Sequence, residues 1–451
     1  MTLPIVAIVG RPNVGKSTLF NRLAGHPLAI VEDHPGTTRD RVYAHATLEE
    51  REVILVDTGG LEVEPTTEMS QKIKAQVEIA LAEADVVLFL VDAAGGITTL
   101  DQDVAQALRR WHRPTILVAN KADNVRRELD AAEFYQLGLG EPLPVSAYHD
   151  TGVYDLIQET LKRLPAADAE DAVGEGVRLA IVGRPNVGKS LLLNTLLGEE
   201  RAIVSDQPGT TRDALDSEIV VDGQAITLID TAGLRRRGRV EGGIEKYSVL
   251  RTLRAIGRAD VALLVMEAAE PATAQDTHVA GYILEAFKGL VLVMNKWDLV
   301  PRQDRDAAKW AQAVRDRFRF LPPTPVLFVS ALKGWGVNDI LPAALEVAKG
   351  RERRVSTGEL NRAVEAAVGA HPPPSKGGRA LRILYVTQAE ARPPTFIFFV
   401  NDTRLLHFSY HRYLENQLRK TFGFEGTPLK LVFKSRERDK VKGKTWAPPA
   451  P

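Results

Sequence analysis

The 451-residue sequence contains no cysteine. Disulfide bonds and thiolate metal sites are therefore excluded, which is compatible with a reducing compartment. The longest apolar stretches, such as DVVLFLVD at residues 85–92, fall far short of the roughly 20 residues that a membrane-spanning helix needs. The chain begins MTLPIVAIVG, with no basic segment and no small-residue cleavage site, so we expect a first strand and not a signal peptide. These absences predict a soluble, cytoplasmic protein.

The net charge is also zero, because 58 Lys and Arg residues balance 58 Asp and Glu residues. The two signs are unevenly placed: residues 351–451 contain 19 Lys and Arg against nine Asp and Glu, a net charge of +10, so the first 350 residues carry −10. This asymmetry predicts an anionic partner for the C-terminal part. The 44% hydrophobic content is ordinary for a globular protein, and the length predicts more than one domain.

The octapeptide GRPNVGKS occurs at residues 10–17 and again at residues 183–190. Four further pairs follow in the same order: GTTRD at 36–40 and 209–213, DTGG at 57–60 with DTAG at 230–233, NKAD at 120–123 with NKWD at 295–298, and VSA at 145–147 and 329–331. The offset grows from 173 to 184 residues, as expected where loops lengthen between fixed elements. The sequence therefore predicts a duplicated domain.

Each half alternates short apolar runs with helical patterns. In the first half, residues 5–9, 53–56, 86–91 and 115–119 are typical of buried strands, and residues 69–82 of an amphipathic helix. This alternation predicts an α/β fold with a mainly parallel sheet and helices on both faces. The motifs follow the strands, at the carboxyl ends where open α/β sheets bind ligands.

The predicted organisation has five parts. A first domain at 1–164 is followed by an acidic, flexible linker at 165–176, a second domain at 177–350, a small α+β domain at 351–436 and a basic, disordered tail at 437–451. In the small domain, the patterns predict helices at 357–368 and 409–421 and strands at 382–387, 396–400 and 428–433.

The octapeptide fits GxxxxGK[ST], the pattern of a loop that cradles phosphates between a strand and a helix. Its glycines let backbone N–H groups approach the phosphates, and the helix N-terminus adds positive potential. Lys16 and Lys189 are predicted to reach the β and γ phosphates of a nucleotide, and Ser17 and Ser190 to bind magnesium. Both glycine-rich loops are thus predicted to be P-loops.

The DxxG motifs are predicted to complete the phosphate and magnesium sites. Asp57 and Asp230 would be outer partners of the metal, and the N–H groups of Gly60 and Gly233 would meet the γ phosphate.

The switch threonines are less closely defined by the sequence. Thr38 and Thr211 lie on proline-containing loops that magnesium and the γ phosphate can order, and we predict that they bind magnesium. The alternatives are that the adjacent Thr37 and Thr210 have that role, or that the threonines of these loops have no role at the metal.

The NKxD motifs predict the base. A carboxylate accepts two hydrogen bonds from the N1–H and 2-amino groups of guanine, whereas adenine offers no such pair of donors. Asp123 and Asp298 therefore predict GTP over ATP, with the backbone of residues 146–147 and 330–331 contacting the guanine oxygen.

The predicted catalytic residues are Lys16, Lys189, Gly60 and Gly233. The predicted nucleotide-binding residues are Gly10, Asn13, Val14, Gly15, Lys16, Ser17, Thr18, Asp57, Asn120, Lys121, Asp123, Ser146 and Ala147 in the first half, and Gly183, Asn186, Val187, Gly188, Lys189, Ser190, Leu191, Asp230, Asn295, Lys296, Asp298, Ser330 and Ala331 in the second. Leu191 replaces Thr18 of the first copy, and nucleotide binding should survive because the magnesium hydroxyl is that of Ser190.

The sequence resembles the Der (EngA) family of bacterial GTPases, which have two tandem GTPase domains followed by a KH-like domain. The resemblance covers essentially the whole chain, including EKYSVLR at 245–251 and YHRYLENQLRKTFGFEGTPLKL at 410–431. It implies GTP hydrolysis coupled to assembly of the large ribosomal subunit, through contacts with ribosomal RNA and with no membrane. A signalling GTPase with a protein or membrane partner, and an RNA-binding scaffold that GTP only stabilises, are the alternatives.

Leu61 and Leu234 stand where many GTPases have a glutamine that orients water, so slow intrinsic hydrolysis is expected. Nucleotide binding without hydrolysis is the alternative. Relatives with this replacement often use a potassium ion, and the resemblance implies that Asn13 and Asn186 bind it. The alternative is that these two asparagines only brace the loop backbone.

Three segments have two interpretations each. The basic run RRRGR at 235–239 fits either contacts with RNA phosphates or a solvated loop. The aromatic run FIFF at 396–399 fits a strand core better than a base-stacking platform. GFEG at 423–426 matches the GxxG of RNA-clamping KH loops, but it lies between a helix and a strand, so we interpret it as a turn.

Overall fold

The computed structural model describes residues 3–25, 43–58, 84–111, 113–165, 176–198, 203–204, 216–221, 223–229, 248–376 and 379–435. The chain separates into two compact units, Met1–Leu345 and Glu346–Pro451. The first unit contains a six-stranded and a seven-stranded sheet, and the second contains a three-stranded sheet. We call the parts built on the six- and seven-stranded sheets the first and second domains.

The sheet of the first domain has the strand order β2-β3-β1-β4-β5-β6. Its elements, in chain order, are β1 (Ile5–Val9), α1 (Lys16–Leu23), β2 (Tyr43–Leu48), β3 (Arg51–Asp57), β4 (Val86–Asp92), α3 (Thr99–Trp111), β5 (Thr115–Asn120), α4 (Val125–Asp130), the 3-10 helix η2 (Ala131–Leu137), β6 (Leu143–Val145) and α5 (Val153–Arg163). Only the β2–β3 pair is antiparallel, and every other neighbouring pair is parallel.

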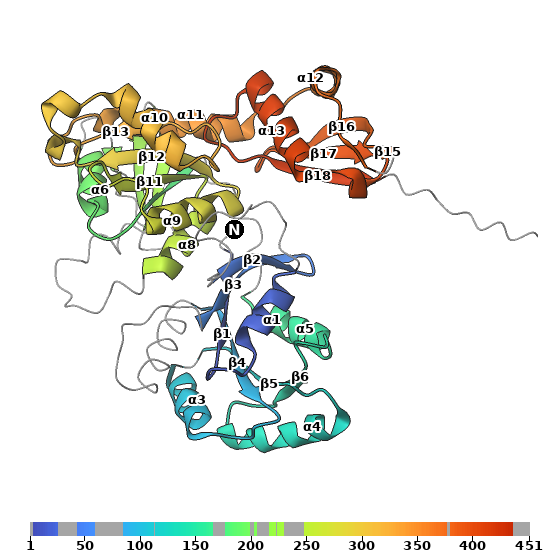
Figure 1. Cartoon of the computed structure of the whole chain (residues 1–451). Helices are drawn as coiled ribbons and strands as arrows, with labels where there is room; N and C mark the ends of the chain where they lie inside the picture. The colour runs from blue at the N-terminus through green and yellow to red at the C-terminus, as the bar shows by residue number, and fades with distance from the viewer. Residues whose placement is uncertain are drawn as a thin grey trace, which may run out of the picture. The chain divides into compact units, whose positions relative to one another are not determined.

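Both faces of this sheet are covered (Figure 1). The strands β1, β4 and β5 are buried along their whole length, as continuous apolar runs predict for a parallel sheet. Leu19 of α1 and Leu156 of α5 pack into the core on one face. Leu108 of α3 and Phe134 of η2 pack into the core on the other.

The second domain repeats this plan. Its strand order is β13-β12-β11-β7-β10-β9-β8. From β13 to β9 this order corresponds to the order of the first sheet read from β6 to β2, and β8 is an additional edge strand. The elements are β7 (Val177–Val182), α6 (Lys189–Leu197), β8 (Ile203–Val204), β9 (Ser217–Val221), β10 (Gln224–Ile229), α8 (Ser248–Arg258), β11 (Val261–Glu267), α9 (Ala274–Glu285), β12 (Gly289–Asn295), η5 (Trp297–Leu299), η6 (Arg302–Asp304), α10 (Ala307–Arg317), β13 (Val326–Phe328), η7 (Val337–Asp339) and α11 (Ile340–Glu352).

The C-terminal unit is a small α+β fold. Its main elements are α12 (Thr357–Ala370), β16 (Ile383–Glu390), β17 (Thr395–Val400), η8 (Thr403–Leu405), α13 (Phe408–Phe422) and β18 (Lys430–Ser435), and a short hairpin joins β14 (Ser375–Lys376) to β15 (Arg379–Ala380). β16 runs antiparallel to β17, and β17 runs parallel to β18 because α13 crosses between them. The helices α12 and α13 share one core with the sheet, through residues such as Val364 and Leu414.

The structure confirms the predicted strands of the first domain and the predicted elements of the C-terminal unit, with ends shifted by at most a few residues. Phe396 and Phe398 are fully buried, so the aromatic run is mainly core. Residues 423–426 form a turn, and Phe424 within it is buried. The helix at 69–82, the linker apart from its two end residues, and the tail at 437–451 lie outside the described residues. No described helix is long and apolar enough to span a membrane.

Glycine is required at the turn before η7, and this generates a stability prediction. Gly336 has φ +66°, and a Cβ there would lie 2.6 Å from the carbonyl oxygen of Phe328. Gly336→Ala should therefore destabilise the second domain by about 1–3 kcal/mol. Gly281→Ala is the matched control, because its Cβ would meet nothing within 4 Å, and within helix α9 alanine should stabilise by about 0.5–1 kcal/mol. Differential scanning calorimetry of the whole chain checks both, and equal transition temperatures for the two variants would contradict this account.

Candidate functional site

Each phosphate loop connects a buried central strand to a helix that begins at the loop lysine. The loop glycines Gly10 and Gly183 have φ +152° and +142°, and a Cβ on them would lie 2.4 and 2.2 Å from a carbonyl oxygen of the neighbouring strand. The asparagines Asn13 and Asn186 are left-handed, with φ 65° and 63°. The two loops thus have the same backbone conformation, which only glycine tolerates at its tightest point.

The ammonium group of each loop lysine donates hydrogen bonds to two carbonyl oxygens of its own loop. Lys16 Nζ donates to the carbonyl oxygens of Gly10 and Arg11, both at 2.9 Å. Lys189 Nζ donates to the equivalent oxygens of Gly183 at 2.7 Å and Arg184 at 2.6 Å.

Both ammonium groups are buried. Burial lowers the pKa of Lys16, the charge of Asp57 opposes that shift, and Arg11 adds to it. A buried cation at the N-terminus of a helix is a strong attractor for an anion.

Two of the three magnesium ligands predicted for the first domain, Ser17 and Asp57, lie together. Ser17 Oγ donates to Asp57 Oδ2 at 2.7 Å, so helix α1 and the end of strand β3 bring a hydroxyl and a carboxylate oxygen to one point. No cluster of three His, Cys, Asp or Glu side chains that could hold a metal occurs among the described residues. Magnesium in nucleotide sites needs only one or two carboxylates besides phosphates and water. This pair of oxygen donors therefore fits that ion.

Several predicted site residues lie outside the part of the chain that the structure describes. These are Thr37, Thr38, Gly60, Leu61, Thr210, Thr211, Asp230, Gly233, Leu234 and the basic run at 235–239. Ser190, the second-domain counterpart of Ser17, is the second residue of helix α6, directly after Lys189.

One buried asparagine in each domain joins the phosphate loop to the loop after the last strand. Asn120 Nδ2 donates to the Val14 carbonyl at 2.7 Å, and its Oδ1 accepts from the Ala147 N–H at 3.0 Å. Asn295 makes the same two bonds, to Val187 at 2.8 Å and from Ala331 at 3.0 Å. The asparagine of NKxD therefore aligns the two loops that are predicted to contact the phosphates and the base.

The aspartates predicted to recognise guanine are oriented by serines. Asp123 Oδ1 accepts a hydrogen bond from Ser146 Oγ at 2.7 Å, and Asp298 Oδ1 accepts one from Ser330 Oγ at 2.6 Å. Both serines are buried. The two sites differ at the second oxygen, because Asp123 Oδ2 is paired with Arg127 at 2.6 Å. Each carboxylate is thus fixed at the carboxyl edge of the sheet, where a purine edge can reach it.

The structure bears on two secondary predictions. Within the described residues, neither Asn13 nor Asn186 makes a side-chain hydrogen bond to its loop, so the bracing alternative finds no support. Thr18 and Leu191 are both exposed on the first turn of their helices. Replacing one by the other therefore disturbs no core contact.

Two carboxylates at the carboxyl ends of strands were not predicted from the sequence. Asp92 and Glu267, which end strands β4 and β11, form ion pairs with the NKxD lysines Lys121 and Lys296 at 2.7 and 2.9 Å. A carboxylate at the carboxyl end of a buried strand was the available signal, since those ends meet at the ligand-binding edge.

A second missed pair, Asp101 and Asp276, lies fully buried at the starts of helices α3 and α9. The sequence signal was T-x-x-D before a helical pattern, which predicts a reciprocal N-terminal cap.

Comparisons with known proteins cover nearly the whole chain. A family model described as 50S ribosome-binding GTPase matches residues 5–121 and 178–296, and one described as KH-domain-like of EngA bacterial GTPase enzymes matches residues 354–434. GTPase Der of Thermomicrobium roseum is 53% identical over 447 residues, covering 97% of this chain and 97% of that protein. GTPase Der of Chloroflexus aggregans is 51% identical over 445 residues, covering 97% and 99%.

The chain thus has two GTPase domains, each with its NKxD asparagine hydrogen-bonded to the phosphate loop, followed by a KH-like domain. The chain belongs to the Der family of GTPases.

Proposed function

We propose that both P-loop domains bind and hydrolyse GTP, and that their nucleotide state controls domain packing and affinity for the assembling large ribosomal subunit. The observation that carries the proposal is the doubled asparagine link, which holds a phosphate loop and a guanine loop together in each domain. The family description that matches both domains names 50S ribosome binding, which supports the choice of subunit.

In the proposed mechanism, Lys16 and Lys189 stabilise the charge that develops on the γ phosphate while a water attacks it in line. The N–H groups of Gly60 and Gly233 assist at the same phosphate. Because Leu61 and Leu234 cannot orient that water, the unassisted reaction is slow.

The proposed magnesium ligands are Ser17, Thr38 and Asp57 in the first domain and Ser190, Thr211 and Asp230 in the second. When bound, magnesium would neutralise phosphate charge. In the first domain, the hydrogen bond from Ser17 Oγ to Asp57 Oδ2 supports the assignment of these two residues.

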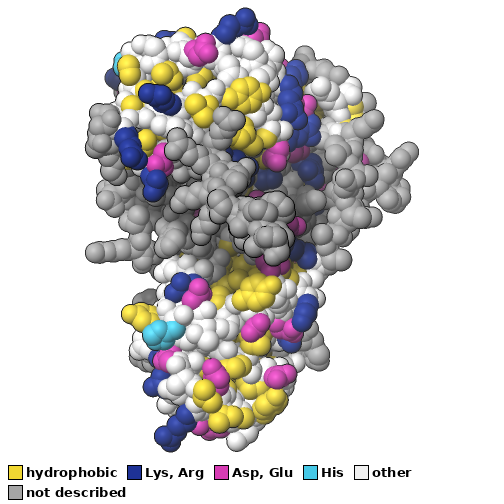
Figure 2. Space-filling view, turned by 90° about the vertical axis from the view of Figure 1, so that its right-hand side faces the viewer, with side chains coloured by type: hydrophobic (Ala, Val, Ile, Leu, Met, Phe, Trp, Pro, Cys, Tyr) yellow, Lys and Arg dark blue, Asp and Glu magenta, His cyan; other side chains and the backbone are white. Residues whose placement is uncertain are grey.

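The C-terminal part supports a nucleic-acid partner by its charge. Residues 351–451 carry a net charge of +10, and RNA phosphates attract such a segment without sequence preference. On the face drawn in Figure 2, Lys and Arg side chains are interspersed with acidic and apolar ones. We propose that the protein contacts ribosomal RNA, and ribosomal or assembly proteins, in the cytoplasm.

We also propose domain limits of 1–164, 177–350 and 351–436, with a linker at 165–176 and a tail at 437–451.

The base assignment can be tested by one substitution. Asp298→Asn removes the carboxylate that accepts the guanine donors, so GTP affinity at the second site should fall roughly ten- to hundredfold and xanthosine triphosphate should become the better ligand. Competition binding to the full chain carrying Lys16→Ala, which disables the first site, measures this. Asp123→Asn in a Lys189→Ala chain is the matched test of the first site. Unchanged GTP affinity would refute the base-recognition role.

Potassium stimulation through Asn13 and Asn186 gives a second prediction. Turnover should be faster in potassium chloride than in sodium chloride at equal ionic strength, because the ion would take the place of an arginine finger in stabilising the developing phosphate charge. Asn13→Ala and Asn186→Ala together should abolish the difference while leaving GDP binding in place. Equal turnover of the unaltered chain in the two salts would remove potassium from the mechanism.

Co-sedimentation with 50S subunits separates the three candidate functions. We expect binding with GTP and not with GDP or without nucleotide, and loss of binding when Lys16→Ala or Lys189→Ala disables the controlling domain. Binding that ignores nucleotide would indicate the RNA-binding scaffold. No binding in any state would indicate a protein or membrane partner.

A further inference from the structure

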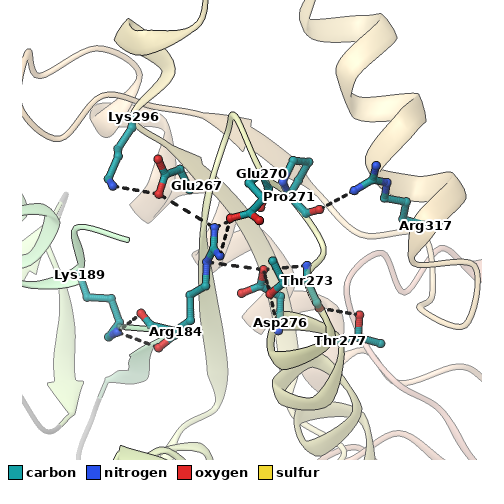
Figure 3. Close-up of polar contacts among 11 residues, drawn as sticks. Arg184, Lys189, Glu267, Glu270, Pro271, Thr273, Asp276, Thr277, Lys296 and Arg317 are labelled. Carbon is teal, nitrogen blue, oxygen red and sulfur yellow. Dashed lines mark hydrogen bonds and ion pairs between the residues drawn. The ribbon is translucent and has the colours of Figure 1, made fainter. Parts of the chain in front are cut away.

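The side chain of Arg184, in the phosphate loop of the second domain, lies among three carboxylates (Figure 3). Its Nη1 pairs with Glu270 Oε2 at 2.8 Å, and its Nη2 also donates to the Glu270 carbonyl at 3.2 Å. Glu267 Oε2 lies 4.0 Å from Nη2, and Asp276 Oδ2 lies 4.0 Å from Nε. The phosphate loop is therefore tied by one side chain to the end of β11 and the start of α9.

Asp276 is the carboxylate of this group that is out of contact with water. It is 0% exposed, whereas the Glu270 side chain is 70% exposed. Its Oδ2 accepts from the N–H and the hydroxyl of Thr273, at 3.1 and 2.8 Å, in a capping box.

Within the described residues, Asp276 Oδ1 and Arg184 Nε are buried without a hydrogen-bond partner. Burial raises the pKa of Asp276, while the Thr273 hydrogen bonds and the Arg184 charge lower it. A buried carboxylate is costly unless a cation compensates it, and Arg184 is the cation within reach.

The first domain has the same arrangement independently. Arg11 Nε donates to Asp101 Oδ2 at 3.3 Å, and Asp101 is also 0% exposed. Asp101 Oδ2 again accepts from the N–H and hydroxyl of the threonine three residues before it, Thr98. Gly95 stands at the position of Glu270, so the buried aspartate is the partner that both arginines share.

The same arginines contribute to the position of the loop lysines. The carbonyl oxygen of Arg184 accepts from Lys189 Nζ at 2.6 Å, and that of Arg11 accepts from Lys16 Nζ at 2.9 Å. Contacts that hold the arginine side chain in place therefore also restrain its carbonyl group, which is one of the two hydrogen-bond acceptors of the lysine ammonium group. A misplacement of about 1 Å in such a group has a large effect on function.

We propose that Asp276, through Arg184, and Asp101, through Arg11, are positioning residues that hold each phosphate loop in the conformation that binds GTP and GDP. This inference rests on the proposed function of the two loops as nucleotide sites. Asp276 itself touches no nucleotide; it acts on the loop backbone through the arginine.

The helix cap and the arginine contact can be separated by substitution. Asp276→Asn removes the charge that faces Arg184 but keeps an amide oxygen able to accept the Thr273 bonds. Thr273→Ala removes the capping hydroxyl and keeps the carboxylate, so it is the matched control for a purely structural role.

The experiment measures binding of a fluorescent GDP, with magnesium, to the full chain carrying Lys16→Ala. We expect Asp276→Asn and Arg184→Gln each to weaken binding roughly tenfold, because the loop then loses a charge pairing that positions it. The double variant should be no weaker than Arg184→Gln alone, and so roughly tenfold and not hundredfold weaker than the parent, because the effect of Asp276 is transmitted through Arg184. Thr273→Ala should lower the melting temperature and leave affinity within about twofold.

Unchanged affinity in Asp276→Asn, or a hundredfold loss in the double variant, would overturn the proposal. If Asp276→Asn does not fold, Arg184→Gln decides, since unchanged affinity in that variant overturns the proposal equally. Absence of GDP binding to the Lys16→Ala parent would instead refute the proposed second nucleotide site, and this inference with it.

Discussion

Two hydrogen bonds from one buried amide hold each nucleotide site together. Asn120 joins the carbonyl of Val14 to the N–H of Ala147, and Asn295 does the same for Val187 and Ala331. Because the asparagine ends a fully buried strand, the packing of the sheet fixes its position. Separating the two loops would leave buried polar groups unpaired, which costs about 1–3 kcal/mol for each group. The loop lysines and the NKxD aspartates keep their places relative to one another through this link.

The two domains share that link but differ in the charges around it. Glu270 pairs with Arg184 in the second domain, and Gly95 stands at that position in the first. Asp123 pairs with Arg127 in the first domain. This last pair is partly exposed, so its contribution is about 0–1 kcal/mol. The duplication therefore gives two sites of similar geometry with different surrounding charges.

In the C-terminal unit, the GFEG segment at 423–426 packs against the hydrophobic core. Arg419 is buried and donates to the carbonyl oxygens of Phe424 at 3.0 Å and Thr427 at 2.7 Å, which closes the turn from inside. Phe424 packs edge-on against Phe396 of the sheet. A loop held in this way is a packed turn between α13 and β18, as the sequence interpretation of GFEG expects.

The sequence by itself determined the features that depend on neighbouring residues: the phosphate loops, the buried strands and the turn at 423–426. Their conformations follow from glycines at positive φ, from apolar runs, and from a lysine whose partners are five and six residues away. It also determined the family, because a series of motifs in fixed order is a property of the sequence. The tertiary structure alone decided the contacts between distant residues. Asn120 and Val14 are 106 positions apart, and Arg11 and Asp101 are 90 apart. Such pairs form only because strand order brings the carboxyl ends of β1, β4 and β5 to one edge, and residue spacing along the chain carries no record of that order.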